Sequence, residues 1–383
     1  MADIQIPYRP QLNTYRSAGK FPDPSGAGPA VPGTTVTARD VAPVSAGEAA
    51  EGAGTPRKPR HIWAWVYGIL LTAYTVFTLL DVFVIPHDTM KVDQQAVADI
   101  YKTESSAVSS ANSSAASSGN EAANGSTVDN TAEEPVITAT ARGYTYRDSN
   151  MTITLNQSYI NNTMVYIADI QLNSIAALKS GLADDSFGRN LKEKTSEIAD
   201  RVGAILAING DYYGFRDTGY VIRNGILYRS TMSSQTAQDL VIYEDGTMEI
   251  ITEGEITAEE LLDKGALQVY SFGPGLVVNG EIAVTSSSEV SHSMNSNPRT
   301  ALGYISPLHY VMVVSDGRTS ESEGLSLLQL ADIMQQLGCE QAYNLDGGGS
   351  TTMYFNGQVI NNPTSGGSRS RERSVSDIVY IGY

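Results

Sequence analysis

A run of apolar residues without a single charge, from Ile62 to Leu80, constrains this chain more than any other feature. As a helix, about 19 residues rise roughly 28 Å, which is close to the hydrocarbon thickness of a bilayer. The chain has 2 tryptophans, and both stand at the start of the run with Tyr67, as interfacial aromatic residues do. The run predicts one membrane-spanning helix within residues 61–86.

The segments on either side of this run are poor in large apolar residues. Residues 1–60 are rich in Pro, Gly, Ala and Thr and predict a disordered cytoplasmic tail. Residues 87–134 include ESSAVSSANSSAASSGNEAANGSTVDN and predict a Ser/Ala-rich flexible stalk. Neither flank offers a core against which a buried helix could pack, which favours the spanning helix. The folded domain is expected over residues 135–383.

Basic residues predict the orientation of the span. Arg57, Lys58 and Arg60 lie directly before it, whereas Lys91 alone follows soon after. The positive-inside rule therefore predicts a cytoplasmic N-terminus and an extracellular C-terminal domain in a single-pass protein of the cell membrane. The run is longer than the apolar region of a typical signal peptide and begins far from the N-terminus, so it indicates a signal anchor.

Composition excludes two classes of protein. The net charge of -17 argues against binding nucleic acid through electrostatic attraction. The chain has 1 cysteine, Cys339, which excludes an intramolecular disulfide framework.

Hydrophobic periodicity predicts an α+β domain, with a mixed β-sheet and a few packed helices. Two segments have helical periodicity: KTSEIADRVG, and SLLQLADIMQQLG, in which Ser326 and Gln329 match a capping box and Gly338 follows the last turn. The strands are predicted in MTITLN, MVYIADIQL, AILAIN, DLVIYEDGTMEII, LHYVMVVSD and QAYNLD.

Both predicted helices lead into a short strand that ends on an acid. GAILAINGD ends with Asn209 and Asp211, and GCEQAYNLD ends with Asn344 and Asp346 at the same spacing from the preceding glycine. An internal repeat and coincidence both stay open. Polar residues at the ends of buried strands are where sites on sheet scaffolds are often built.

A glycine run follows Asp346 directly. Successive N–H groups in a glycine-rich turn can form a nest that binds an anion, and hydroxyl groups add donors, although a tight structural loop is the alternative. The residues of this candidate nest are Gly347, Gly348, Gly349, Ser350 and Thr351.

Arginines near the other predicted strands and near the C-terminus suit phosphate recognition, because the guanidinium fork can bind two oxygens at once. Arg299 lies in NPRTALGY, Asp316 and Arg318 follow the strand LHYVMVVS, and Arg373 stands beside Glu372 in RSRERSV. A solvated surface guanidinium, or a structural ion pair, is the alternative for any one of them.

These motifs resemble the phosphodiester glycosidase family. The resemblance rests on INGDYYG, GYVIRNGILY, FGPGLVVNG, NPRTALGY, VVSDGR, LSLLQLADIMQQLGCEQAYNLDGGGSTTMYFNG and RERSVSDIVYIGY, in this order. It covers roughly Ala204 to Tyr383, and it implies hydrolysis of a sugar 1-phosphodiester between the anomeric carbon and the phosphate oxygen.

On this resemblance Asp346 is the first candidate for the carboxylate that acts at the anomeric carbon, Asp211 is the second, and Arg299 stabilises the phosphate. Asp211 stands where relatives often have a small residue, which weakens the case for it. The expected substrate-binding residues are Asn209, Asn344, Gly347, Gly348, Gly349, Ser350, Thr351, Asp316, Arg318, Glu372 and Arg373.

No cofactor is expected, since the 4 histidines are dispersed and lack zinc-ligand spacing, although a divalent cation such as calcium on the carboxylates stays open. The expected partners are a phosphorylated glycan or sugar phosphodiester in the cell envelope and the membrane itself. Two alternatives stay open, a glycosyl transferase in exopolysaccharide assembly and a non-catalytic phosphoglycan-binding module.

Overall fold

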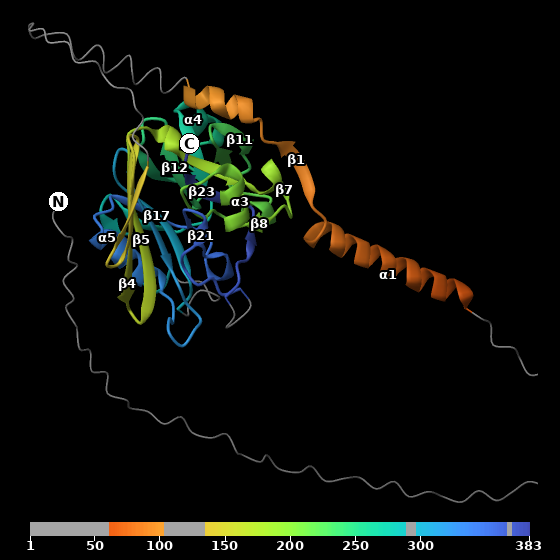
Figure 1. Cartoon of the computed structure of the whole chain (residues 1–383). Coiled ribbons are helices and arrows are strands. Elements are labelled where there is room, and N and C mark those ends of the chain that lie inside the picture. Colours follow the sequence, from red (N-terminus) through yellow and green to blue (C-terminus); the bar gives the residue numbers. More distant parts are fainter. Residues whose placement is uncertain (1–60, 103–134, 289–295, 366–369) are drawn as a thin grey trace, which may run out of the picture. The chain divides into compact units, whose positions relative to one another are not determined.

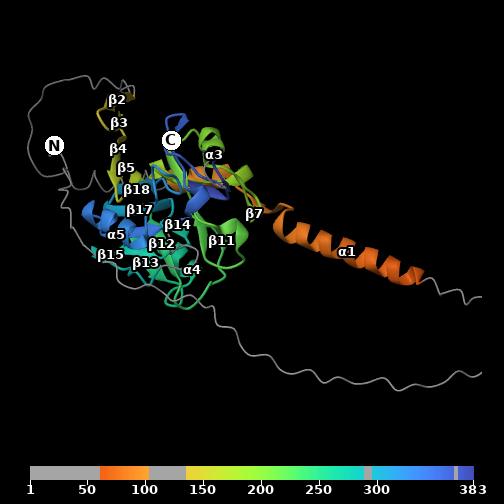
Figure 2. The same cartoon turned by 90° about the horizontal axis from the view of Figure 1, so that it is seen from below.

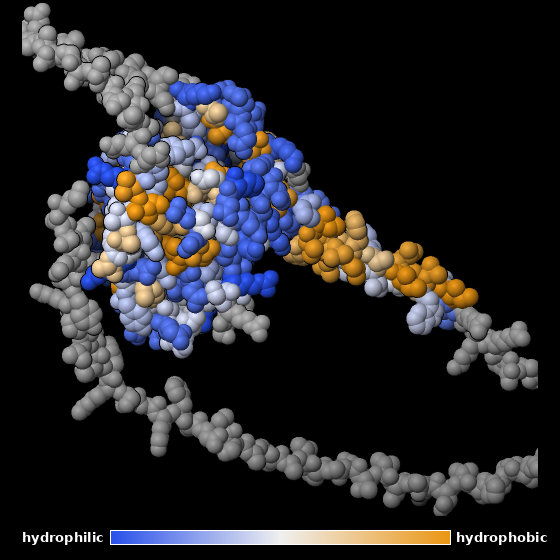
Figure 3. All heavy atoms as spheres, viewed as in Figure 1, coloured by the Kyte–Doolittle hydropathy of each residue, from blue (hydrophilic) through white to orange (hydrophobic). Residues whose placement is uncertain are grey.

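The computed structural model describes residues 61–102, 135–288, 296–365 and 370–383 (Figure 1). Helix α1 (Ile62–Phe83) contains the apolar run, and none of its residues is buried. It is long and apolar enough to cross a membrane. Its surface is apolar along most of its length (Figure 3). The predicted tail, residues 1–60, lies outside the described residues.

The start of the predicted stalk is folded, which corrects the stalk boundary. Strand β1 (His87–Lys91) pairs antiparallel with β7 (Ser186–Arg189), and residues 94–102 form a helix. Val97 and Tyr101 on this helix are buried in the core, and the Tyr101 hydroxyl donates to the Leu178 carbonyl at 3.2 Å. These two residues are four apart and form a short apolar stripe, which the polar composition of residues 87–134 concealed. Residues 103–134 lie outside the described part.

Three sheets make up most of the domain and a few helices pack on them, so the predicted α+β class is confirmed. The sheet was expected to be mixed, whereas neighbouring strands in these sheets pair antiparallel. The largest has nine strands in the order β16 (Glu281–Ile282), β15 (Gly275–Val278), β19 (Gln341–Asn344), β17 (Arg299–Ser306), β18 (His309–Ser315), β5 (Thr163–Leu172), β4 (Met151–Ile160), β3 (Gly143–Arg147) and β2 (Val136–Thr140).

Two smaller sheets have five strands each. One has the order β21 (Gln358–Val359), β20 (Met353–Phe355), β9 (Leu206–Asn209), β23 (Asp377–Ile381) and β6 (Leu178–Leu182). The other has the order β11 (Ile226–Arg229), β10 (Val221–Arg223), β14 (Ala266–Tyr270), β12 (Gln238–Tyr243) and β13 (Met248–Thr252). A short pair joins β22 (Ser374–Val375) to β8 (Glu193–Lys194).

The alternation of side chains along β18 shows how the large sheet is buried on both faces. Tyr310, Met312 and Val314 enter the main core, which also draws residues from both smaller sheets. Val311 and Val313 point to the opposite face, where α5 (Leu327–Gln336) covers the sheet (Figures 1 and 2). A fully buried strand of this kind gives a continuous apolar run in the sequence, as HYVMVV does.

The predicted helices have the predicted ends. The Ser326 hydroxyl of α5 accepts from the Gln329 N–H, the Gln329 side chain accepts from the Ser326 N–H, and Gly338 has a positive φ of 84°. Helix α3 (Thr195–Val202) ends at Gly203, whose φ is 66°. A third short helix, α4 (Ala258–Asp263), covers part of the β10–β14 sheet.

Candidate active site

The ends of β9 and β19 meet, although the two strands belong to different sheets. The Asp346 N–H donates to the Gly210 carbonyl at 3.3 Å, and the Asn209 side chain donates to the Asp346 carbonyl at 2.6 Å. Asn209 also accepts from the Thr300 hydroxyl at 2.8 Å and from the Thr352 N–H at 3.2 Å. Asn209 is therefore occupied in holding the loop that carries Asp346, and its predicted contact with substrate stays a prediction.

The glycine run passes between neighbours that leave no room for side chains. The Gly348 N–H donates to the Pro298 carbonyl at 2.8 Å, and residues Gly348–Ser350 form a single 3₁₀ turn. A Cβ on Gly348 would lie 2.9 Å from Arg318 Nη2, and one on Gly349 would lie 2.9 Å from Arg373 Nη2. The glycines thus let two guanidinium groups approach the loop backbone.

Arg318 and Arg373, two of the predicted substrate-binding residues, converge on this loop, and their binding role stays a prediction. Both are exposed, and the Arg318 fork donates to the Asn297 side chain at 3.0 and 3.2 Å. Burial and the nearby Arg373 charge lower the pKa of Arg318. The charges of Arg318 and Arg373 repel each other beside a loop of small residues. A bound anion would relieve this repulsion.

Several polar atoms of the same region are buried without a hydrogen-bond partner among the described residues. They include Asn344 Oδ1, Thr351 Oγ1 and Thr352 Oγ1. Asn344 has its amide group engaged, since Nδ2 donates to the Gly273 carbonyl at 2.8 Å. Buried polar atoms normally have partners, so these three atoms leave hydrogen-bonding capacity unused around the Asp346 loop.

Asp346 is the part-exposed carboxylate of this region. Burial raises the pKa of its carboxyl, and the Ser350 hydroxyl and the charges of Arg373 and Arg216 act against this rise. Asp346 therefore lies in a polar, positively charged environment, which suits a carboxylate that acts at a reacting carbon; its catalytic role stays a prediction.

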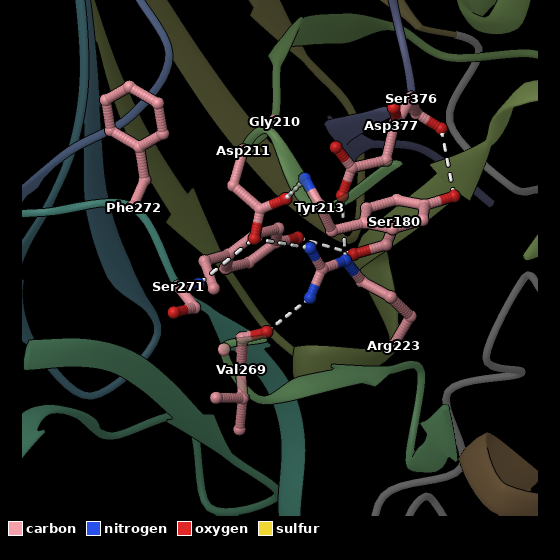
Figure 4. A network of polar contacts seen from close by, with 12 residues as sticks. Ser180, Gly210, Asp211, Tyr213, Arg223, Val269, Ser271, Phe272, Ser376 and Asp377 are labelled. Carbon is pink, nitrogen blue, oxygen red and sulfur yellow. Dashed lines mark hydrogen bonds and ion pairs between the residues drawn. The ribbon is translucent and has the colours of Figure 1, made fainter. Parts of the chain in front are cut away.

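Asp211 has a different environment, which argues against its predicted role as a catalytic carboxylate (Figure 4). Its Oδ2 accepts from Arg223 Nη2 at 2.9 Å and from the Ser271 N–H at 3.0 Å, and its Oδ1 accepts from the Tyr213 N–H at 2.9 Å. Arg223 also donates to Asp377 Oδ2 at 2.8 Å. The carboxyl of Asp211 is thus committed to a buried network and does not face solvent.

The rest of this network is internal as well. The side chains of Arg223 and Asp377 are 1% and 0% exposed, and the Arg223 guanidinium lies 4.1 Å from the centre of the Tyr270 ring. Burial raises the pKa of Asp377 to about 7 in spite of the neighbouring Arg223. A buried cation held by two carboxylates fixes the geometry between sheets, since removing one partner would leave a charge uncompensated.

Two other predicted substrate-binding residues have structural contacts instead. Glu372 accepts from the N–H and the hydroxyl of Ser196 at 3.2 and 2.6 Å, so it caps the N-terminus of α3. Asp316 is buried and accepts from the Asn362 N–H at 2.7 Å and from the Tyr166 hydroxyl at 3.2 Å. Burial raises the pKa of Asp316, and these donors oppose that rise. Both carboxylates organise the walls around the site.

Arg299 lies at the start of β17, beside the glycine loop. It is 5% exposed, and its Nε donates to the Leu325 carbonyl at 2.9 Å. A Cβ on Gly347 would lie 3.9 Å from the Arg299 Cα, which places the two backbones side by side. Its catalytic role remains a prediction.

Sequence reasoning missed three part-exposed side chains beside Asp346: Tyr212, Arg216 and Phe272. The guanidinium carbon of Arg216 lies 5.7 and 5.1 Å from the ring centres of Tyr212 and Phe272. A signal was available, since Tyr212 lies in INGDYYG and Phe272 in FGPGLVVNG, and both segments carry the family resemblance. Within the described ranges, no three His, Cys, Asp or Glu side chains gather as a metal site would require.

The comparisons with known proteins agree with this geometry. A family model described as phosphodiester glycosidase matches residues 202–382. Residues 202–382 are therefore similar in sequence to the phosphodiester glycosidase family. It is 31% identical over 203 residues to the SPbeta prophage-derived uncharacterized protein YomE of Bacillus subtilis (strain 168), a match that covers 51% of this chain and 31% of that protein.

A second relative has a named activity. The N-acetylglucosamine-1-phosphodiester alpha-N-acetylglucosaminidase of Mus musculus is 31% identical over 210 residues, which cover 50% of this chain and 40% of the mouse protein. The chain thus spans less than half the length of these curated relatives.

The fold of the glycosidase-like domain is shared with a solved structure. The catalytic domain of the zebrafish N-acetylglucosamine-1-phosphodiester alpha-N-acetylglucosaminidase, auto-inhibited by its pro-peptide, superposes with a TM-score of 0.50 at 19% identity. The match covers 61% of this chain and 83% of the zebrafish chain.

Proposed function

We propose that this chain hydrolyses a sugar 1-phosphodiester in a cell-envelope or extracellular glycan. The observation that carries the proposal is the part-exposed Asp346 beside a glycine loop that Arg318 and Arg373 flank. The family match over residues 202–382, and the activity named for the mouse relative, support this reaction and make N-acetylglucosamine the first sugar to test.

One carboxylate is enough for the proposed reaction, since the leaving group does not need a second carboxylic acid to protonate it. Phosphate leaves as an anion, so its departure depends on charge stabilisation by the arginines and the loop more than on protonation. Water supplies the hydroxyl that ends on the anomeric carbon, and the phosphate keeps the bridging oxygen. Asp346 serves this step as nucleophile or as base for water. Asp211, Asp316 and Asp377 are buried and bonded, which leaves this role to Asp346.

The test is release of free sugar by the full chain in detergent. Hydrolysis of UDP-N-acetylglucosamine, or of an aryl N-acetylglucosamine 1-phosphodiester, is the expected result. Asp346→Asn should lower turnover at least about a hundredfold with substrate binding largely kept. Sugar transfer that requires an added glycan acceptor would favour the transferase, and binding without release of sugar from any phosphodiester would favour the binding module. Turnover of the Asp346→Asn variant near that of wild type would remove Asp346 from the chemistry.

We further propose that α1 anchors the domain in the cell membrane with the N-terminus in the cytoplasm. The length and apolar surface of α1 and the basic cluster before it support this topology. Protease added to intact cells should remove the C-terminal domain and leave an N-terminal fragment protected. Protection of the domain until the cells are lysed would rule out this orientation.

A further inference from the structure

Three aromatic residues and one arginine form a continuous part-exposed surface that the proposed phosphate contacts leave unused. Tyr212 and Phe215 stack with ring centres 4.7 Å apart and planes 19° from parallel. Arg216 lies over the other face of this group, with its guanidinium carbon between the Tyr212 and Phe272 rings at 5.7 and 5.1 Å. We call Tyr212, Phe215, Arg216 and Phe272 the aromatic wall.

The aromatic wall borders Asp346 through two backbone connections. The Asp346 N–H donates to the Gly210 carbonyl at 3.3 Å, and Gly210 precedes Tyr212 by two positions. The Asn344 side chain donates at 2.8 Å to the carbonyl of Gly273, which follows Phe272 directly. The Arg216 charge also acts on the pKa of Asp346, against the rise that burial causes. Both segments of the wall therefore flank the strand end that carries the carboxylate.

Buried neighbours fix the two backbone segments of the wall. Asp211 accepts from the backbone N–H groups of Tyr213 and Ser271, which fixes both segments from the inside. In Figure 4 the Phe272 ring points away from the Arg223 network. Phe272 packs against the main core with part of its surface and stays part-exposed, so the wall is held by a rigid support.

The charges of the wall suit a neutral ligand better than an anion. Arg216 Nη1 donates to the Ser271 carbonyl at 3.1 Å, and two aromatic faces contact its guanidinium, so its charge is already partly compensated. Arg318 and Arg373, in contrast, repel each other across the glycine loop. An anion is therefore stabilised more beside Arg318 and Arg373 than on the wall.

We infer that the aromatic wall is the subsite for an uncharged glycosyl ring. This inference rests on the proposed function, and it fixes the direction in which the substrate lies across Asp346. The C–H face of the sugar packs on the part-exposed surface of Phe272 and against the edge of Tyr212, since Phe215 and Arg216 cover the faces of the Tyr212 ring. The remaining N–H groups of Arg216 donate to a hydroxyl or acetamido oxygen. The phosphate then lies beside Arg318 and Arg373. Sugars that carry a carboxylate are poor ligands for this wall, because they gain little from the compensated Arg216.

The test separates the two halves of the substrate. N-acetylglucosamine without phosphate and inorganic phosphate without sugar are titrated separately against the full chain in detergent, with saturation-transfer NMR for the sugar and calorimetry for phosphate. Phe272→Ala and Tyr212→Ala should each weaken sugar binding about tenfold and leave phosphate binding unchanged. Arg373→Ala should do the reverse.

Matched variants exclude a general effect on folding. Tyr212→Phe keeps the ring and should keep sugar binding. Tyr144→Ala removes a 41% exposed ring that stacks on Phe355 in a different part of the domain, and should change neither affinity. Unchanged sugar affinity in both alanine variants of the wall, parallel loss of both ligands, or no sugar binding by the wild-type chain would each overturn the inference.

The outcome for the wall is distinguishable from the outcome for the proposed function. Sugar binding that depends on Tyr212 and Phe272, without hydrolysis of any phosphodiester, would uphold the wall and refute hydrolysis. Hydrolysis that proceeds equally in the wild type and in the Phe272→Ala variant would uphold the proposed function and refute the wall.

Discussion

A buried acid outside the site should make the stability of the domain fall as pH rises. Asp239 on β12 is fully buried, and neither of its carboxyl oxygens has a hydrogen-bond partner among the described residues. Burial and the neighbouring Glu253 carboxyl raise the pKa of Asp239 from 3.8 to about 8. The folded state therefore keeps a proton on Asp239 that the unfolded chain loses above pH 4.

The sign and size follow from this difference in proton binding. Stability from a carboxyl whose folded pKa is raised is fully present below its unfolded pKa and is lost as pH rises toward the folded value. While the folded state holds one proton more than the unfolded state, the free energy of unfolding falls by about 1.4 kcal/mol per pH unit. Between pH 5 and pH 8 the loss is about 3 to 4 kcal/mol, because titration of the folded state begins near the upper limit.

Asp239→Asn removes this titration and keeps the shape of the protonated acid. The variant should match wild type near pH 4 and exceed its free energy of unfolding at pH 8 by up to about 4 kcal/mol. Urea unfolding at pH 5 to 8 should be followed by the near-ultraviolet circular dichroism of tyrosine, because Trp63 and Trp65 both lie in α1. Glu255→Gln, at an exposed acid two residues after Glu253, is the control. Equal pH slopes for wild type and Asp239→Asn would refute the reasoning.

Three further substitutions test the architecture of the site. Gly349→Ala places a Cβ 2.9 Å from the Arg373 guanidinium and should weaken phosphate binding about tenfold. In the Arg373→Ala background the same substitution should not lower phosphate affinity further, which a calorimetric double-mutant cycle measures. Arg223→Met leaves two carboxylates buried without their cation and should lower the free energy of unfolding by about 3 to 5 kcal/mol in urea titrations. A change under about 1 kcal/mol would contradict the network, since even one lost hydrogen bond lowers stability by about that amount. Glu372→Ala removes the cap of α3 and should cost about 1 kcal/mol of stability while phosphate affinity stays the same, so a selective loss of phosphate binding would return Glu372 to the site.

Local signals in the sequence were sufficient for α3 and α5 and for the strands β4, β5, β9, β12, β13, β18 and β19, whereas α4 and most of the other strands were not predicted. The α5 helix has a capping box, one apolar face and a glycine after its last turn, and each of these acts within a few residues along the chain. The helix at residues 94–102 was missed because its stability comes from burying Val97 and Tyr101 in a core built by residues far along the chain. The composition of a segment does not show that a distant core will bury it. An apolar stripe of two residues within a polar segment can indicate such burial.

The glycine run and its arginines were predictable for a related reason. Three consecutive glycines are costly to order, so they indicate close approach of other atoms, and Arg318 and Arg373 are the groups that approach. The aromatic wall had a weaker signal, because Tyr212 and Phe272 lie in segments that carry the family resemblance but no local pattern links them. Tyr212 and Phe272 are sixty positions apart in the sequence, and only the fold brings both rings to the Arg216 guanidinium.

Asp211 and Asp346 show where reasoning from sequence reaches its limit. Each follows a glycine-ended helix, a short buried strand and an asparagine, so the local pattern assigns them the same role. Asp211 and Asp346 differ in the arginine that a distant segment of the chain supplies to each. Arg223 on β10 neutralises Asp211 inside the core, whereas Arg373 reaches the Asp346 loop from the exposed C-terminal segment. Asp211 is part of the buried support, whereas Asp346 stays part-exposed, and a charge can serve chemistry only where its counter-charge leaves it accessible.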